Sequence, residues 1–149
     1  MKEVAVISRF FRRLFKRHTP LAPVLVDEDS IPPSHNTDRD FFFRLQSALK
    51  ETEFFLKPDC SRQDLMTLIG VNKNQITRII RNYGGFTNVS SYVNSLRLDY
   101  AIDLMKRHPE KKMKEIAVES GFESFQNFNR VFKKHFSDTP YHYFRTIFS

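Results

Sequence analysis

A pattern of residues that occurs twice in the second half of the chain constrains its fold more than any other feature. The two copies are Leu65-x4-Gly70-x7-Arg78 and Ile116-x4-Gly121-x8-Arg130. In each copy a helical pattern is expected to end at the glycine, because glycine adopts the left-handed backbone conformation without a Cβ penalty. The second copy has one extra residue after its glycine. The repetition predicts two copies of one supersecondary unit.

The second copy, over about 112–136, has the features of a helix-turn-helix. Ser124 offers a side-chain oxygen that can cap a helix predicted over about 125–136. Three- and four-residue spacing predicts its buried face, which contains Phe128, Val131, Phe132 and either His135 or Phe136. The opposite face carries amide and cation donors, namely Gln126, Asn129, Arg130 and Lys133. Two short helices around a glycine turn, the second with such a row, are typical of a helix-turn-helix.

The first copy, over about 61–84, predicts the same unit. Ser61 and Asp64 form a possible capping box for a helix that ends near Ile69. Asn72 can cap a second helix, which the glycine pair at 84–85 should end. The core side of this second helix is expected to contain Ile76, Ile79 and Ile80. Its exposed side is expected to contain Lys73, Asn74, Gln75, Thr77, Arg78 and Arg81.

A long helix is predicted between the two copies, over about 88–108. Its apolar residues are expected to form one stripe, made of Tyr92, Val93, Leu96, Tyr100, Ala101, Leu104 and Met105. It should end at His108, because proline disfavours helix in the residue before it. About twenty residues correspond to roughly 30 Å of helix, and successive major grooves on one face of B-DNA lie ~34 Å apart. The spacing therefore favours two recognition helices that enter one side of a duplex.

These residues resemble the DNA-binding domain of the AraC/XylS family of transcription regulators. The matching positions in the second copy are Ile116-Ala117, Gly121-Phe122, Phe128, Arg130, Phe132-Lys133-Lys134, Thr139-Pro140 and Tyr143. The matching positions in the linker helix are Tyr92-Val93-Asn94, Leu96-Arg97 and Ala101. The similarity covers roughly 58–145. The sequence departs from the family pattern at Ser137, where a glycine is usual, and at Phe144, where an arginine is usual.

The exposed rows carry the donors that distinguish base edges. Arginine pairs with guanine O6 and N7, whereas asparagine and glutamine pair with adenine N6 and N7. The residues expected to read bases are Asn74, Gln75, Thr77, Arg78, Phe125, Gln126, Asn129 and Arg130, and the resemblance places all of them except Gln75 at groove contacts. The residues expected to meet phosphate are Lys73, Arg81, Lys133 and Lys134. Phe125 is expected to meet a thymine methyl group, and Arg97 is expected to form either a DNA contact or an internal ion pair.

The first 57 residues predict three further segments. Residues 4–17 alternate bulky apolar residues with arginine and lysine at helical spacing, so a basic amphipathic helix is expected within 1–18. Residues 19–37 hold four prolines and an acidic cluster, which predicts a linker. A helix capped by Asp38 should follow over about 39–55, with Phe42, Leu45 and Leu49 inward. This helix is assigned to one DNA-binding domain over 38–149.

Composition limits the classes of function that fit the chain. Its net charge is +7, with the basic excess in 1–18 and 58–149, which suits a polyanionic partner. The chain has one cysteine, and its five histidines show no ligand spacing, so neither a metal nor a cofactor is expected. No apolar run approaches the ~18 residues of a membrane span. No nucleophile–base order, phosphate-binding glycine loop or paired carboxylates indicate an enzyme.

The sequence therefore predicts an all-α protein in which a long linker helix joins two helix-turn-helix subdomains. Its expected function is sequence-specific binding of double-stranded DNA as a transcription regulator, with RNA polymerase as a further candidate partner. The alternative is a membrane-surface or partner-binding module that acts through 4–17, within a larger membrane-linked regulator. The expected location is the cytoplasm, with membrane association under the alternative. A small-molecule sensing domain does not fit into 1–57, so direct control by such an effector is not expected.

Overall fold

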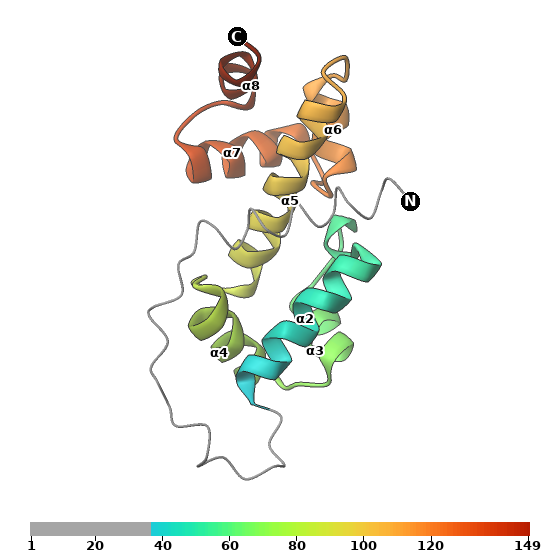
Figure 1. Ribbon diagram of the computed structural model, residues 1–149, viewed down its shortest axis with the longest axis vertical. Coiled ribbons are helices and arrows are strands. Elements are labelled where there is room, and N and C mark those ends of the chain that lie inside the picture. The colour runs from blue at the N-terminus through green and yellow to red at the C-terminus, as the bar shows by residue number, and fades with distance from the viewer. Residues whose placement is uncertain (1–36) are drawn as a thin grey trace. The chain divides into compact units, whose positions relative to one another are not determined.

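The computed structural model describes residues 37–149, which fold into helices joined by turns and contain no strand (Figure 1). The all-α fold predicted from the sequence is thereby confirmed. The described residues form two compact units, one from residues 37–52 and 61–92 and the other from 53–60 and 93–149. The predicted amphipathic helix and nearly all of the proline-rich linker lie outside the described residues.

The first unit is a bundle in which helix α2 (Asp38–Thr52) packs on α3 (Arg62–Ile69) and α4 (Lys73–Gly84) (Figure 1). The predicted inward residues Phe42, Leu45 and Leu49 of α2 are buried. The core is completed by apolar residues of α3, α4 and the following segment, namely Leu65, Ile69, Val71, Ile76, Ile79, Ile80, Val89 and Tyr92. The second helix of the first helix-turn-helix therefore buries the face that its spacing predicts.

The two ends of α2 differ from the prediction. Asp38 is the first residue of the helix and not its cap. Thr37 takes that role, because its Oγ1 accepts the Asp40 N–H (3.4 Å) and the Asp40 carboxylate accepts the Thr37 N–H (3.2 Å). The helix ends at Thr52, before the predicted residue 55, because Glu53 adopts a left-handed φ of 49°. A short 3-10 turn, η2 (Phe54–Leu56), follows in the second unit.

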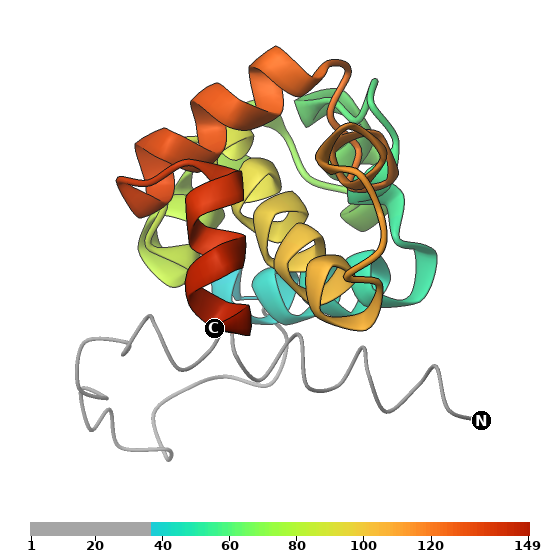
Figure 2. The same ribbon diagram turned by 90° about the horizontal axis from the view of Figure 1, so that it is seen from above.

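The second unit contains η2, most of α5 (Val89–Arg107), α6 (Met113–Glu119), α7 (Phe125–Phe136) and α8 (Pro140–Phe148). Figure 2 shows α6, α7 and α8 arranged around the C-terminal half of α5. The expectation of one apolar stripe on α5 is wrong. Leu98 and Ile102 are buried together with Ala101, Leu104 and Met105, because α6 and α7 supply apolar side chains to the same core.

The duplication seen in the sequence extends to the hydrogen bonds of the two turns. Val71 N–H donates to the Met66 carbonyl at 3.1 Å, and Phe122 N–H donates to the Ala117 carbonyl at 3.1 Å. Both glycines, Gly70 and Gly121, have positive φ. In the second copy the helix already ends at Glu119, two residues before its glycine. The hydrogen bond that closes the turn, between residues five positions apart, therefore occurs in both helix-turn-helix units.

The ends of α7 and the start of α8 follow their sequence signals. Ser124 Oγ accepts the Asn127 N–H at 3.1 Å, which confirms the predicted cap. Ser137, where the family pattern has glycine, has a left-handed conformation with φ of 57°. Thr139 caps α8 and Pro140 occupies its first turn. Ser137 therefore adopts a backbone conformation that glycine usually takes.

Arg97 is an internal structural residue, and its hydrogen bonds go to backbone carbonyls. Only 8% of the residue is exposed. Its guanidinium donates to the carbonyls of Phe55 and Lys57 at 2.7 Å each, and to that of Pro58 at 3.5 Å. The guanidinium also lies 5.9 Å from the centre of the Phe122 ring. These contacts join residues 53–60 to α5 and to the turn before α7.

Candidate nucleic-acid interface

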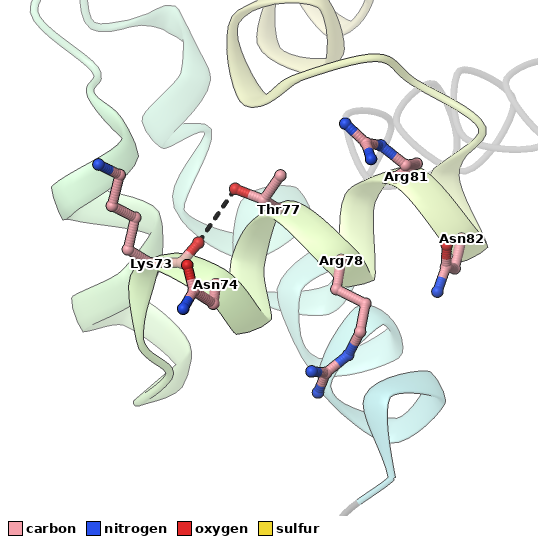
Figure 3. A pocket seen from close by; sticks show the side chains of 6 residues that line it. All are labelled: Lys73, Asn74, Thr77, Arg78, Arg81 and Asn82. Atoms are coloured by element: carbon pink, nitrogen blue, oxygen red, sulfur yellow. Dashed lines mark hydrogen bonds between the residues drawn. The ribbon is translucent and has the colours of Figure 1, made fainter.

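The exposed side of α4 forms a shallow hollow of about 270 Å³, and within residues 37–149 its lining comes from that helix alone (Figure 3). The lining residues are Lys73, Asn74, Thr77, Arg78, Arg81 and Asn82. Three of them are cations, and residues 73–84 contain no acidic residue. Asn82 was missed from the sequence, although it lies four residues after Arg78 and so follows the same helical spacing. The hollow therefore combines positive charge with amide donors and acceptors.

Gln75 and Thr77 make hydrogen bonds within α4 itself. The Gln75 Oε1 accepts the Asn72 N–H at 3.0 Å, while the Asn72 side chain accepts the N–H groups of Asn74 and Gln75. Gln75 thus belongs to a capping box at the start of α4, and it does not line the hollow. The Thr77 hydroxyl donates to the Lys73 carbonyl at 3.0 Å (Figure 3). The lone pairs and the methyl group of Thr77 remain for other contacts.

Arg78 forms a two-point ion pair with Asp38 at the start of α2. Its Nη2 donates to Asp38 Oδ1 at 2.8 Å, and its Nε donates to Oδ2. The hydrogen bond from Arg78 lowers the pKa of Asp38, with a further electrostatic contribution, while partial burial opposes the shift. The same pair raises the pKa of Arg78. Sequence reasoning did not find this partner, because 40 positions separate the two residues.

The exposed side of α7 presents a second row of polar and basic side chains. Gln126, Arg130, Lys133 and Lys134 are exposed, and Asn129 is partly exposed. Arg130 Nη2 donates to Asn127 Oδ1 at 2.8 Å. Residues 125–136 carry three cations and no acidic residue. Asn127 was not among the predicted site residues, although its three-residue spacing from Arg130 could have indicated the contact.

Phe125 is less available than the other predicted residues of α7. Its ring is partly buried and packs against the core of the second unit. The ring centre lies 6.2 Å from that of Phe128 and 6.2 Å from that of Tyr141. Contact with a thymine methyl group therefore remains a prediction that would use only the exposed part of the ring.

Residues 37–149 contain neither a candidate metal site nor a candidate membrane span. No group of three or more histidine, cysteine, aspartate or glutamate side chains in this part of the chain could hold a metal ion. No helix within these residues is both long and apolar enough to cross a membrane.

Comparison with known proteins shows a family match that covers residues of both helix-turn-helix units. A family model described as a helix-turn-helix domain matches residues 65–146, more than half of the chain. The match begins within α3 and ends within α8, so it includes both rows. No solved structure shows significant similarity to the chain.

Three curated relatives also match the chain. The HTH-type transcriptional regulator GlxA of Rhizobium meliloti is 30% identical over 96 residues, which are 64% of this chain and 29% of that protein. The probable transcription factor PqrA of Proteus vulgaris is 38% identical over 73 residues, or 48% of this chain and 57% of that protein. The TCP pilus virulence regulatory protein of Vibrio cholerae is 30% identical over 100 residues, which are 64% of this chain and 35% of that protein. The matches thus span about 29% to 57% of these relatives.

Proposed function

The chain belongs to the AraC/XylS family of helix-turn-helix transcription regulators, and from this premise we propose that it recognises specific DNA sequences as a regulator of transcription. In this proposal α4 and α7 each enter the major groove, in two adjacent segments of one duplex. The observation that carries it is the pair of helix-turn-helix units, each with an exposed row of cations and amides and no acidic residue in its second helix.

The two rows contain the groups needed for two kinds of DNA contact. Arg78 and Arg130 supply planar donors for guanine, and Asn74, Gln126 and Asn129 supply amides for adenine. Lysine carries a single rotatable point charge, which suits phosphate contacts. Lys73, Lys133 and Lys134, with Arg81, are therefore assigned to the phosphate backbone. Gln75 is given a lesser role, because its side chain closes the capping box of α4.

The length of α5 supports recognition of two groove segments. The helix contains 19 residues, which correspond to about 28 Å. Successive major grooves on one face of B-DNA are ~34 Å apart. A helix of this length can separate two recognition helices by about one turn of the duplex.

A selection from random DNA followed by footprinting of the full chain tests this function. We expect one enriched sequence, with two protected segments about 10 base pairs apart on one face of the duplex. Protection of a single short segment would rule out use of both helices. Equal binding of the enriched sequence and random DNA would rule out sequence-specific recognition.

Residues 4–17 support a second role, at an anionic membrane surface. They place five bulky apolar side chains (Ile7, Phe10, Phe11, Leu14 and Phe15) and five arginine or lysine residues at helical spacing, and they lie outside the residues that the structure describes. Flotation of the full chain with anionic vesicles, compared with a Phe10→Asp variant, tests this role. Loss of flotation in the variant with unchanged DNA binding would show that the two activities are separate. RNA polymerase remains a further proposed partner.

A further inference from the structure

The ion pair between Asp38 and Arg78 uses one edge of the arginine. Asp38 accepts hydrogen bonds from Nε and Nη2. A guanidinium has five N–H groups in one plane. The ion pair therefore leaves both N–H groups of Nη1 and one of Nη2, and one N–H from each of these nitrogens forms the fork that fits O6 and N7 of guanine. Asp38 can thus hold Arg78 while the arginine binds a base.

The exposure of the two side chains agrees with one edge of the guanidinium being paired and the adjacent edge being accessible to DNA. The Arg78 side chain is 52% exposed, whereas that of Asp38 is 21% exposed. Figure 3 shows the Arg78 side chain reaching from α4 toward α2, and Arg78 also lines the hollow. The carboxylate therefore lies on the protein side of the pair, and the arginine retains an accessible edge.

We propose that Asp38 is a positioning residue for base recognition: its carboxylate holds the Nε and Nη2 edge of Arg78 so that the adjacent edge, formed by Nη1 and Nη2, is presented to a guanine. This inference rests on the proposed function of α4 as a recognition helix. An arginine held in one orientation loses less rotamer freedom when it binds a base. The negative charge of Asp38 also repels the phosphate groups of every sequence, and only a guanine contact of Arg78 offsets this repulsion.

The second helix-turn-helix contains a neutral counterpart of this arrangement. Arg130, which corresponds to Arg78 in the duplication, donates from Nη2 to Asn127 Oδ1 at 2.8 Å. Each repeated arginine is therefore held by an oxygen acceptor in its own unit. Only the first copy uses a carboxylate, which is supplied by α2. The electrostatic effect on discrimination is accordingly expected at Arg78 alone.

Full-length variants bound to the selected DNA site test the proposal. The guanine contacted by Arg78 is identified as the base pair at which Arg78→Ala loses its preference. That guanine is then replaced by 7-deazaguanine, which lacks the N7 acceptor. We expect wild-type protein to prefer guanine, and Asp38→Asn to reduce this preference roughly three- to tenfold. The same variant should bind random DNA at least as tightly as wild type, because it has lost a negative charge.

Asp40→Asn is the matched control, since Asp40 lies in the same helical turn but bonds to Thr37. It removes the same charge and should leave the guanine preference unchanged. Arg78→Lys provides a second variant that keeps the cation, and it should lose the preference because an ammonium lacks the two edges. In an Arg78→Ala background, Asp38→Asn and Asp40→Asn should have equal effects on binding.

Several outcomes would overturn the proposal. Asp38→Asn with wild-type guanine preference would show that the pair does not position Arg78. Tighter binding to guanine without loss of preference would show that Asp38 withholds Arg78 from DNA. Arg78→Ala with unchanged preference at every base pair would show that Arg78 reads no base. Failure of wild-type protein to distinguish the selected site from random DNA would instead refute the proposed function itself.

Discussion

The guanidinium of Arg97 and the backbone carbonyl of Phe55, 42 positions apart in the chain, are joined by a buried hydrogen bond of 2.7 Å. A second bond of 2.7 Å runs from Arg97 to the Lys57 carbonyl. Burial lowers the pKa of Arg97, since it disfavours the charged form. Arginine nevertheless remains charged, because its ordinary pKa lies far above neutrality. Carbonyl oxygens thus provide the polar surroundings that this buried cation requires.

Replacement of Arg97 by methionine should destabilise the second unit. Methionine has an unbranched side chain like that of arginine, but it cannot donate the hydrogen bonds that the guanidinium makes to the carbonyls of Phe55 and Lys57. We expect a loss of about 2–4 kcal/mol in the free energy of unfolding, measured by urea denaturation. Arg107→Met is the control, because Arg107 is exposed and lies 5.9 Å from the Tyr100 ring; it should cost less than about 1 kcal/mol. Equal losses in both variants would contradict the structural role of Arg97.

The two repeated glycines should differ in their tolerance of alanine. Both have positive φ, which costs a non-glycine residue about 1–2 kcal/mol. A Cβ at Gly70 would meet nothing within 4 Å, whereas one at Gly121 would lie 2.7 Å from the Leu56 carbonyl oxygen. Gly121→Ala should therefore destabilise the protein by at least about 1 kcal/mol more than Gly70→Ala. Thermal unfolding followed by circular dichroism measures the difference, and equal effects would refute the close approach.

Glycine at position 137 should stabilise the protein. Ser137 has φ of 57°, and its N–H donates to the Lys133 carbonyl at 2.9 Å at the end of α7. Glycine relieves the cost of this backbone conformation, so Ser137→Gly should raise the free energy of unfolding by about 0.5–1 kcal/mol. Ser137→Ala keeps a Cβ and should give no such gain. An equal increase in both variants would indicate that the backbone conformation is not the cause.

The ion pair between Asp38 and Arg78 predicts a pH dependence of stability. The pKa of Asp38 in the folded protein lies below its ordinary value of 3.8. The pair therefore contributes fully above about pH 4, and its contribution disappears as the pH falls through the lowered pKa. The stability difference between wild type and Asp38→Asn should shrink between pH 5 and pH 2, measured by urea denaturation. A difference that stays constant would contradict the lowered pKa, and Asp40→Asn provides the comparison for loss of charge alone.

Arg130 and Lys133 should affect DNA binding in different ways. Arg130→Ala should cost about 1–3 kcal/mol on the selected site and relax preference at one base pair, because it removes a base-reading group. Lys133→Ala should weaken binding to every sequence alike and reduce the dependence on salt. Affinities for the selected site and for random DNA, each measured over a salt series, separate the two effects. Equal losses on both DNAs for Arg130→Ala would argue against base reading by this residue.

Local sequence signals predicted most of the helices well. The capping residues Ser61, Asn72 and Ser124 all occupy the positions expected from the sequence. The errors lie where nearby residues compete or where tertiary packing intervenes. Thr37 caps α2 in place of Asp38, because the Thr37–Asp40 pair satisfies both backbone groups. Burial on more than one side of α5 was missed, since a period along one helix does not show how many partners surround it.

The candidate site was likewise predicted from the sequence only in part. Helical spacing grouped Lys73, Asn74, Thr77, Arg78 and Arg81, and the structure places these five in one hollow. Their contacts with DNA, and those of the α7 row, remain predictions. The sequence did not show that Gln75 is used by a capping box, although its three-residue spacing from Asn72 could have indicated it. Nor did it show that the Phe125 ring packs against Tyr141.

The sequence by itself determined most of the helices and their caps, the repeated glycine turns and the charge of the two exposed rows. Each of these depends on residues within about four positions of one another, where spacing along the chain specifies contact. Only the tertiary structure decided that Asp38 holds Arg78, that Arg97 donates to carbonyls of residues 55–58, and that Gly121 lies against Leu56. These partners are about 40 or more positions apart in the chain. Packing brings them together, because buried polar groups require partners and close-packed cores leave space for few alternatives.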